Sequence, residues 1–295
     1  MTQPRILAFA GRKQSGKNCA FNYILGFQMV KLGIVRGSFA ISDKGQLWIS
    51  DLFGDEDHRG VFDVERTNQE MVDFKEEYIY PYVKNYSFAD GLKRGLCMDI
   101  LGLSFSSVYG TDEEKNRDTH LNWEDMPGVI SEKGVWDLLN TREVKARMGK
   151  TNLDKVKSHI QYHPAGPMSG REVMQYVGTD ICRTMYGDVW ADSCIRKITK
   201  EGSLFAVITD CRFPNEVEAI QKVGGKVVRL TRGMESKDNH YSEIALDPDN
   251  FDWNKFDAIL DNAGPEGSIP KQNTMILQML QQWGWVEPTE EELHN

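Results

Sequence analysis

Cysteine is scarce in this 295-residue sequence, and its few positions exclude several kinds of protein. The chain has five cysteines, an odd number, with no CxxC or Cys/His spacing between them. This pattern argues against a disulfide-built scaffold or a zinc site, and it predicts reduced thiols. The five are Cys19, Cys97, Cys182, Cys194 and Cys211.

Clustered positive charge and long apolar runs are missing as well. The formal net charge is −9, with no basic arm or block, which argues against a nucleic-acid groove but leaves room for a small anionic ligand. The sequence has neither an apolar run of membrane length nor a signal peptide, so we expect a soluble cytoplasmic protein that binds no membrane. A hydrophobic fraction of 40% is enough for a sizeable core.

A glycine-bounded loop near the N-terminus is the strongest local signal. Residues 5–10 form a short apolar run, residues 11–18 follow the pattern Gly-x4-Gly-Lys-Asn, and residues 19–25 read as a helix. Glycines allow backbone N–H groups to close around phosphate oxygens, the helix N-terminus adds partial positive charge, and Lys17 supplies an ammonium group. Asn18 stands where Ser or Thr is usual, so magnesium binding stays open at this point. The alternative is an ordinary strand–turn–helix.

Strands and helices alternate along the rest of the chain, which predicts an α/β layered fold with a parallel sheet. We expect a hairpin over residues 38–50, a polar surface excursion over 55–76, and mostly loops with one or two short helices over 109–167. Further strands are expected at 82–88, 204–210, 226–230 and 258–262. Further helices are expected from 89, at 169–181, 190–200 and 215–223, and at 271–283.

Several charged side chains follow the predicted strands, where parallel sheets place their ligands. Asp210 ends the most apolar strand and could hold a magnesium water shell or orient an acceptor; its alternative is to cap the next helix. Arg212 and Arg232 also follow strands, and Arg171 opens a helix capped by Ser169. Guanidinium groups bind phosphate bidentately, although a given Arg is usually a solvated surface group.

Three other features allow two interpretations each. The polar residues 238–243 could form a lid or an ordinary loop. Trp190 could stack on a base or belong to the core. The apolar side chains of the last helix could form a homodimer interface, and they serve equally as core; they are Met275, Leu277, Met279, Leu280 and Trp283.

Seven sequence blocks in collinear order resemble the phage-type deoxynucleoside monophosphate kinases, and more distantly the metazoan phosphomevalonate kinases of the same P-loop superfamily. They are S-G-K-N at 15–18, F-A-D-G-L-K at 88–93, R-E-V-M-Q-Y-V-G-T-D at 171–180, T-D-C-R-F-P-N-E at 209–216, V-R-L-T-R-G at 228–233, H-Y-S-E at 240–243 and L-D-N-A-G at 260–264. The resemblance implies one P-loop kinase domain over residues 1–295, a three-layer sandwich with a central parallel sheet. Two segments match no block, about 38–80 and 110–165, and we interpret them as insertions; a lid would cover about 231–250.

The resemblance also implies an activity, its cofactors and its residues: phosphorylation of deoxynucleoside monophosphates (dNMPs) by ATP with Mg²⁺. Donor-binding residues would be Gly11, Lys13, Ser15, Gly16, Lys17, Asn18, Cys19 and Asn262. The catalytic set would be Lys17, Asp210, Arg171, Arg212 and Arg232, with Asn18 and Asp210 near the metal. The acceptor would contact Lys93, Arg171, Gln175, Asp180, Trp190 and Glu243.

Three rival functions stay open from the sequence. A phosphomevalonate-type kinase would share the fold and ignore nucleosides. A kinase acting on modified bases within DNA would need a basic trough, which the charge of −9 disfavours. A non-catalytic regulator would bind ATP and release no ADP with any acceptor.

Overall fold

The computed structural model describes residues 4–66, 68–129, 139, 141–147, 165–232, 241–263 and 268–287. Its internal contacts divide the chain into two compact units. The first contains residues 1–90 and 190–295, and the second contains residues 91–189. Each unit has its own buried apolar cluster or clusters, so each is built around a core of its own.

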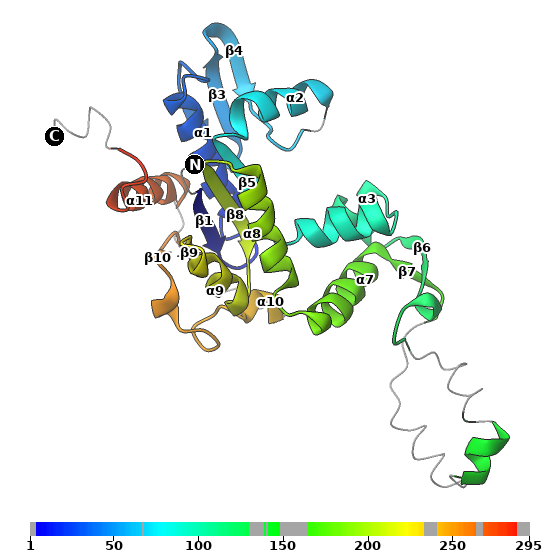
Figure 1. Ribbon diagram of the computed structural model, residues 1–295. Helices are drawn as coiled ribbons and strands as arrows, with labels where there is room; N and C mark the ends of the chain where they lie inside the picture. The colour runs from blue at the N-terminus through cyan, green and yellow to red at the C-terminus, as the bar shows by residue number, and fades with distance from the viewer. Residues whose placement is uncertain are drawn as a thin grey trace. The chain divides into compact units, whose positions relative to one another are not determined.

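A five-stranded parallel sheet forms the centre of the first unit (Figure 1). Its strand order is β10-β9-β1-β8-β5, and every neighbouring pair is parallel. The strands are β1 (Arg5–Ala10), β5 (Val83–Tyr86), β8 (Phe205–Cys211), β9 (Lys226–Leu230) and β10 (Ala258–Leu260). The predicted parallel sheet is therefore confirmed, and the carboxyl ends of its strands share one edge.

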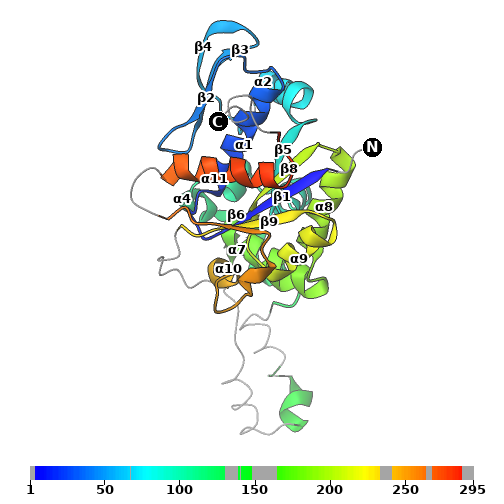
Figure 2. The same cartoon turned by 90° about the vertical axis from the view of Figure 1, so that its left-hand side faces the viewer.

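Helices cover both faces of this sheet, as the two views together show (Figures 1 and 2). Leu7 and Phe9 of β1 point into a cluster with α1 (Lys17–Lys31) and α11 (Ser268–Gln282). Ile6 and Ala8 point the other way, into a cluster with α8 (Val189–Glu201) and α9 (Pro214–Lys222). The alternation follows from the two-residue period of a strand, and it produces the predicted three layers.

Helix α11 contributes to the first of these clusters. Ile276, Met279 and Leu280 are buried there, and Met275 and Trp283 pack against it. The apolar positions of the last helix thus serve the intramolecular core, one of the two roles that the sequence allowed. A homodimer stays a prediction.

The segment between α1 and β5 forms more structure than the sequence indicated. The predicted hairpin, β2 (Phe39–Ile41) and β3 (Leu47–Leu52), gains a third antiparallel strand, β4 (Asp55–Val61). A helix follows, α2 (Gln69–Phe74), continued by the π-helical η1 (Lys75–Ile79). The stretch 55–76 is polar and largely exposed where the structure describes it, as expected, but its strand was not foreseen, because β4 is an edge strand whose charged side chains face water and hide the alternation of a strand.

The second unit consists of short elements around a small core. They are η2 (Gly91–Ile100), α3 (Phe105–Tyr109), α4 (Asp112–Lys115), β6 (Asp118–Asn122), η3 (Trp123–Asp125), β7 (Pro167–Ser169), α7 (Gly170–Gln175) and η4 (Tyr176–Arg183). Strands β6 and β7 pair across more than forty residues of sequence, which the prediction of loops and short helices missed. The predicted cap is confirmed, since Ser169 and Glu172 form a capping box at α7.

Parts of the predicted insertions and lid lie outside the described residues. These parts are residues 130–138, 140 and 148–164 of the second insertion and residues 233–240 of the lid. After them the chain forms α10 (Tyr241–Ile244) and η5 (Trp253–Lys255). Within the described ranges, no helix combines the length and apolar character that a membrane span requires.

Candidate active site

The glycine-bounded loop joins β1 to α1 at the carboxyl edge of the sheet. Gly16 directly precedes the helix with φ 96°, a left-handed conformation that glycine adopts without strain. A Cβ atom at Gly11 would lie 2.4 Å from Ser15 Oγ, so this position has no room for a side chain. The predicted strand, loop and helix are confirmed, and the geometry has the features of a phosphate-binding loop.

Lys17 is folded back over this loop. Its Nζ donates hydrogen bonds to Gly11 O at 2.8 Å, Arg12 O at 2.7 Å and Ser15 Oγ at 3.3 Å. Burial, followed by the nearby Arg212, lowers the pKa of Lys17 from 10.5 to about 8, and Glu243 opposes the shift. The ammonium is therefore held at the loop by neutral oxygens that a phosphate could replace.

Two carboxylates from one segment hold the first half of the loop. Glu243 of α10 accepts a hydrogen bond from the backbone N–H of Lys13 at 2.7 Å, and it also pairs with Arg212. A backbone N–H of the loop and a guanidinium group, both donors suited to phosphate, thus converge on one carboxylate.

The second carboxylate, Asp247, lies between two arginines. Arg12 Nε is 3.2 Å from Asp247 Oδ2, and Arg229 Nη2 is 2.8 Å from Oδ1. All three are nearly inaccessible to solvent: Arg12 is 8% exposed, Arg229 1% and Asp247 6%. A buried charge requires a partner, so this Arg–Asp–Arg group fixes the loop to β9.

Asn262 and Gln272 hold the second half of the loop. Asn262 Nδ2 donates to Ser15 O at 2.7 Å and to Gln272 Oε1 at 2.6 Å, and Gln272 Nε2 donates to Gly16 O at 3.1 Å. Both side chains are completely buried. Asn262, predicted to contact the donor, therefore lies beside the loop and braces its backbone.

Asp210, near the end of β8, binds the segment that follows β5. Its Oδ1 accepts from Phe88 N at 2.9 Å, and its Oδ2 accepts from Ser87 Oγ at 2.5 Å and Ala89 N at 3.1 Å. The alternative that Asp210 caps α9 was wrong, because Glu216 accepts the hydrogen bonds of the backbone N–H groups that precede this helix. The carboxylate lies at the sheet edge with both oxygens in use.

Arg232 and Cys19 lie near the braced part of the loop. Arg232 N donates to Asn262 Oδ1 at 2.9 Å, and its Nη2 is buried with no hydrogen-bond partner among the described residues. Burial raises the pKa of the Cys19 thiol, while the charge of Arg232 opposes this shift. A buried, unpaired N–H is costly, so Arg232 offers a donor for an anionic ligand.

The remaining predicted residues are distributed over both units. Trp190 is buried at the start of α8 in the first unit. In the second unit, Arg171 Nη2 pairs with Asp112 at 2.7 Å, and Lys93 Nζ lies 5.1 Å from the centre of the Tyr109 ring. Gln175 and Asp180 are exposed on α7 and η4.

Three residues that contact the loop or its braces were missed by the sequence reasoning: Arg12, Asp247 and Gln272. Arg12 lies inside the loop pattern and could have been included for that reason alone. The other two show no local signal for this role, because their partners are 10 to 256 residues away in the sequence.

Comparison with known proteins supports the kinase family that the sequence motifs resemble. Residues 82–265, more than half of the chain, match the family described as deoxynucleotide monophosphate kinase. A protein of Acanthamoeba polyphaga mimivirus, named as a candidate deoxynucleotide monophosphate kinase, is 26% identical over 173 residues, which are 54% of this chain and 67% of that protein. The matched range starts next to β5 and extends past Asn262, so it includes Asp210, Glu243 and Asp247. The chain belongs to the deoxynucleotide monophosphate kinase family.

Proposed function

We propose that this protein transfers the γ-phosphoryl group of ATP to the 5′-phosphate of a deoxynucleoside monophosphate, giving ADP and a deoxynucleoside diphosphate. The observation that carries the proposal is the braced loop with the Lys17 ammonium at its centre, in a chain of this kinase family. Phosphoryl transfer needs little covalent chemistry from a protein, so positioning and charge are the main requirements.

The donor would lie on the loop. Backbone N–H groups from Lys13 to Cys19 would surround its phosphates, and Lys17 would exchange its carbonyl partners for phosphate oxygens. Arg212, paired with Glu243 in the structure, could release this partner and contact the transferring group. The unpaired Nη2 of Arg232 would supply a further donor.

The residues near the loop fit a hydrated magnesium ion. Asn18 is exposed at the start of α1, and its amide oxygen is of the ligand type that Mg²⁺ accepts. Asp210 would act through water, since its two oxygens are already engaged. When bound, the ion would neutralise negative charge that develops on the phosphates during transfer.

Lys93, Arg171, Gln175 and Asp180 are our candidates for the acceptor site, together with Trp190 and Glu243. Two of them are cationic, as a monophosphate requires, and Arg171 sits at the start of a capped helix. Asp210 would order the segment before Lys93 through its bonds to Phe88 and Ala89.

The direct test is an ADP-release assay with Mg-ATP and a panel of acceptors. The panel contains the four common dNMPs, base-modified dNMPs, the matching ribonucleotides and phosphomevalonate. Turnover with one or more dNMPs is the expected result. ATP binding with no turnover on any nucleotide would overturn the proposal, and turnover on phosphomevalonate alone would indicate the related kinase activity.

Lys17→Ala tests the role of the loop in this reaction. It should lower kcat by roughly 10²–10³-fold, because an electrostatic group that stabilises the transferring phosphoryl is lost. Lys31→Ala, at the exposed end of the same helix, is the matched control and should keep wild-type turnover. Circular dichroism should show both variants folded; a fully active Lys17→Ala enzyme contradicts the assignment.

A further inference from the structure

A hollow of about 350 Å³ opens next to Asn18, the residue that follows Lys17. We call it the Asn18 pocket. Its walls come from α1, the turn between β2 and β3, the chain just after β4, and β5. The lining residues are Asn18, Phe21, Asn22, Lys44, Gly45, Gln46, Leu47, Val61, Phe62, Asp63, Val64, Glu65 and Asn85.

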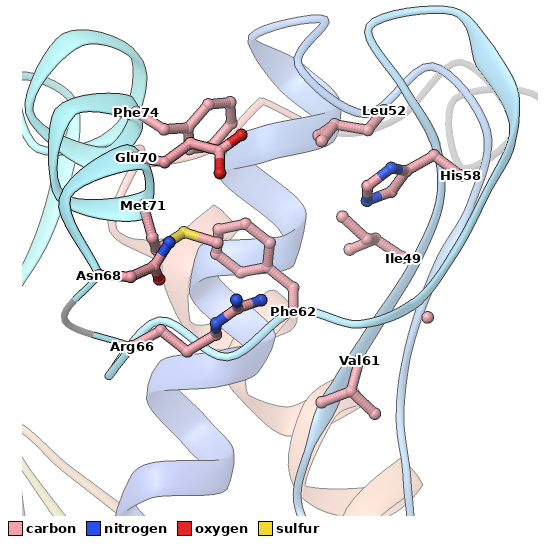
Figure 3. A pocket seen from close by; sticks show the side chains of 11 residues that line it. Ile49, Leu52, His58, Val61, Phe62, Arg66, Asn68, Glu70, Met71 and Phe74 are labelled. Carbon is pink, nitrogen blue, oxygen red and sulfur yellow. The ribbon is translucent and has the colours of Figure 1, made fainter.

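A second hollow, which shares Val61 and Phe62 with the Asn18 pocket, gives a useful comparison. Figure 3 shows it between β3–β4 and α2, with Met71 and Phe74 on the helix side. Its volume is about 250 Å³, whereas pockets for small-molecule ligands span roughly 300 to 1,000 Å³. The Asn18 pocket falls within that range, and it alone of these two includes a residue of the phosphate loop.

The chemistry of the Asn18 pocket suits a nucleoside and disfavours a phosphate. Phe21, Leu47 and Phe62 form a buried apolar floor. The charged residues of the lining are one lysine and two carboxylates, an unfavourable balance for an anion. Four amide side chains, Asn18, Asn22, Gln46 and Asn85, surround the floor, and amides pair with the donor–acceptor edges of nucleobases.

Several of these polar groups are available to a ligand. The side chains of Asn18, Lys44 and Gln46 form no hydrogen bond to any other described residue. Asn22 Nδ2 is committed to Gly45 O at 2.8 Å, which fixes the β2–β3 turn against α1. Thr209 Oγ1 donates to Asn85 Oδ1 at 3.4 Å, so the two N–H groups of the Asn85 amide remain available to a ligand.

The position of Asn18 identifies the acceptor as the occupant, because the residue after the loop lysine faces the metal and the lysine itself reaches the β- and γ-phosphates. The pocket therefore adjoins the end of the donor at which transfer occurs. Asn262 and Gln272 contact the loop at Ser15 and Gly16, and neither residue lines the pocket. Most of the wall comes from residues 44–65, outside the range that matches the family.

We infer that the Asn18 pocket binds the nucleoside part of the acceptor monophosphate and contributes to base selection. The inference rests on the proposed function, and it adds the segment between α1 and β5 to the acceptor site. Asp63 and Glu65 would accept hydrogen bonds from exocyclic amino groups, which adenine, guanine and cytosine carry and thymine lacks.

The test compares Asn85→Leu and Gln46→Leu with Gln28→Leu, a control on α1 outside this pocket. The pocket variants should raise KM for the preferred dNMP roughly tenfold, with KM for ATP changed less than about twofold. Glu65→Gln, in an exposed loop, should shift relative kcat/KM toward dTMP. An unchanged acceptor KM and base ranking, or a rise in KM for ATP instead, would overturn the inference.

Binding of unphosphorylated deoxynucleosides to the full chain, measured by saturation-transfer NMR, separates this inference from the proposed function. If deoxynucleosides bind the wild-type protein but not Asn85→Leu, and no dNMP is turned over, the pocket assignment stands and the kinase activity is refuted. Turnover on dNMPs with unaffected pocket variants would retain the activity and refute the pocket. If Asn85→Leu fails to fold, Glu65→Gln and Gln46→Leu still decide between these outcomes.

Discussion

The ammonium of Lys17 sits on three oxygens of its own loop in a largely buried place. Burial disfavours its charged form, which explains the lowered pKa of about 8. A phosphate that replaces the carbonyl oxygens would stabilise that charge. Binding of the proposed donor and protonation of Lys17 would therefore be coupled.

The pH dependence of the reaction follows from this coupling. Below pH 8 Lys17 keeps its proton and attracts phosphate, and above it the neutral amine prevails. We expect kcat/KM for ATP to fall as pH rises through about 8, approaching roughly tenfold per pH unit. A rate profile from pH 6 to 10 measures this. The guanidinium of Lys17→Arg stays charged over this pH range, so the fall in kcat/KM near pH 8 should disappear if the variant is active. A fall at the same pH in that variant would contradict the assignment to Lys17.

Asp247 is the residue whose loss should destabilise the first unit most clearly. Asp247→Asn removes the carboxylate that pairs with two buried arginines, at a cost of about 3–5 kcal/mol. Thermal unfolding should show Tm lowered by roughly 10 °C. Asp249→Asn, an exposed carboxylate two residues further on, is the control and should keep the wild-type Tm. Equal Tm values for both variants would show that the buried group contributes little.

Helix α11 has two roles at the scale of elements. One face completes the apolar cluster with α1, and Gln272 reaches the phosphate loop directly and through Asn262. The loop is thus held from α11 at Ser15 and Gly16 and from the 241–253 segment at Arg12 and Lys13. A loop fixed at both halves loses little entropy when it binds phosphate.

Removing the contact from α11 should weaken donor binding. Gln272→Leu keeps the size of the side chain and leaves Gly16 O and Asn262 Nδ2 each without one partner, at a cost of about 1–3 kcal/mol. We expect the Kd for ATP, measured by calorimetry, to increase several-fold. Gln282→Leu, at the end of the same helix, provides the comparison. A Kd that rises equally in both variants would indicate a general effect of the helix and exclude a specific brace.

Charge is the property that matters most at the scale of the whole molecule. With a sequence charge of −9 and no basic block, we expect the chain to bind DNA weakly, because binding to DNA phosphates needs clustered Lys and Arg. Fluorescence anisotropy with labelled duplex DNA at 50 mM salt should therefore show no binding below about 10⁻⁵ M protein. Saturable micromolar binding that weakens with salt would contradict this and revive the rival kinase of bases within DNA.

Local patterns were sufficient for the elements of the sheet. The apolar runs of β1 and β8 and the Gly-x4-Gly-Lys loop between β1 and α1 appear where the sequence predicts them, because each depends on neighbouring residues alone. Strand β4 escaped notice because its charged residues follow the needs of an exposed edge. The pairing of β6 with β7 was also missed, because the two strands lie far apart in the sequence.

The sequence by itself determined the glycine-bounded loop, the parallel sheet and the family, all of which depend on short patterns in a fixed order. Only the tertiary structure decided what holds the loop: Asp247 is 235 residues from Arg12, and Gln272 is 256 residues from Gly16. It also decided that Asp210 orders the chain after β5 and that Asn262 braces the loop. A buried polar group must find partners wherever the fold brings them, and a linear pattern carries no record of that distance.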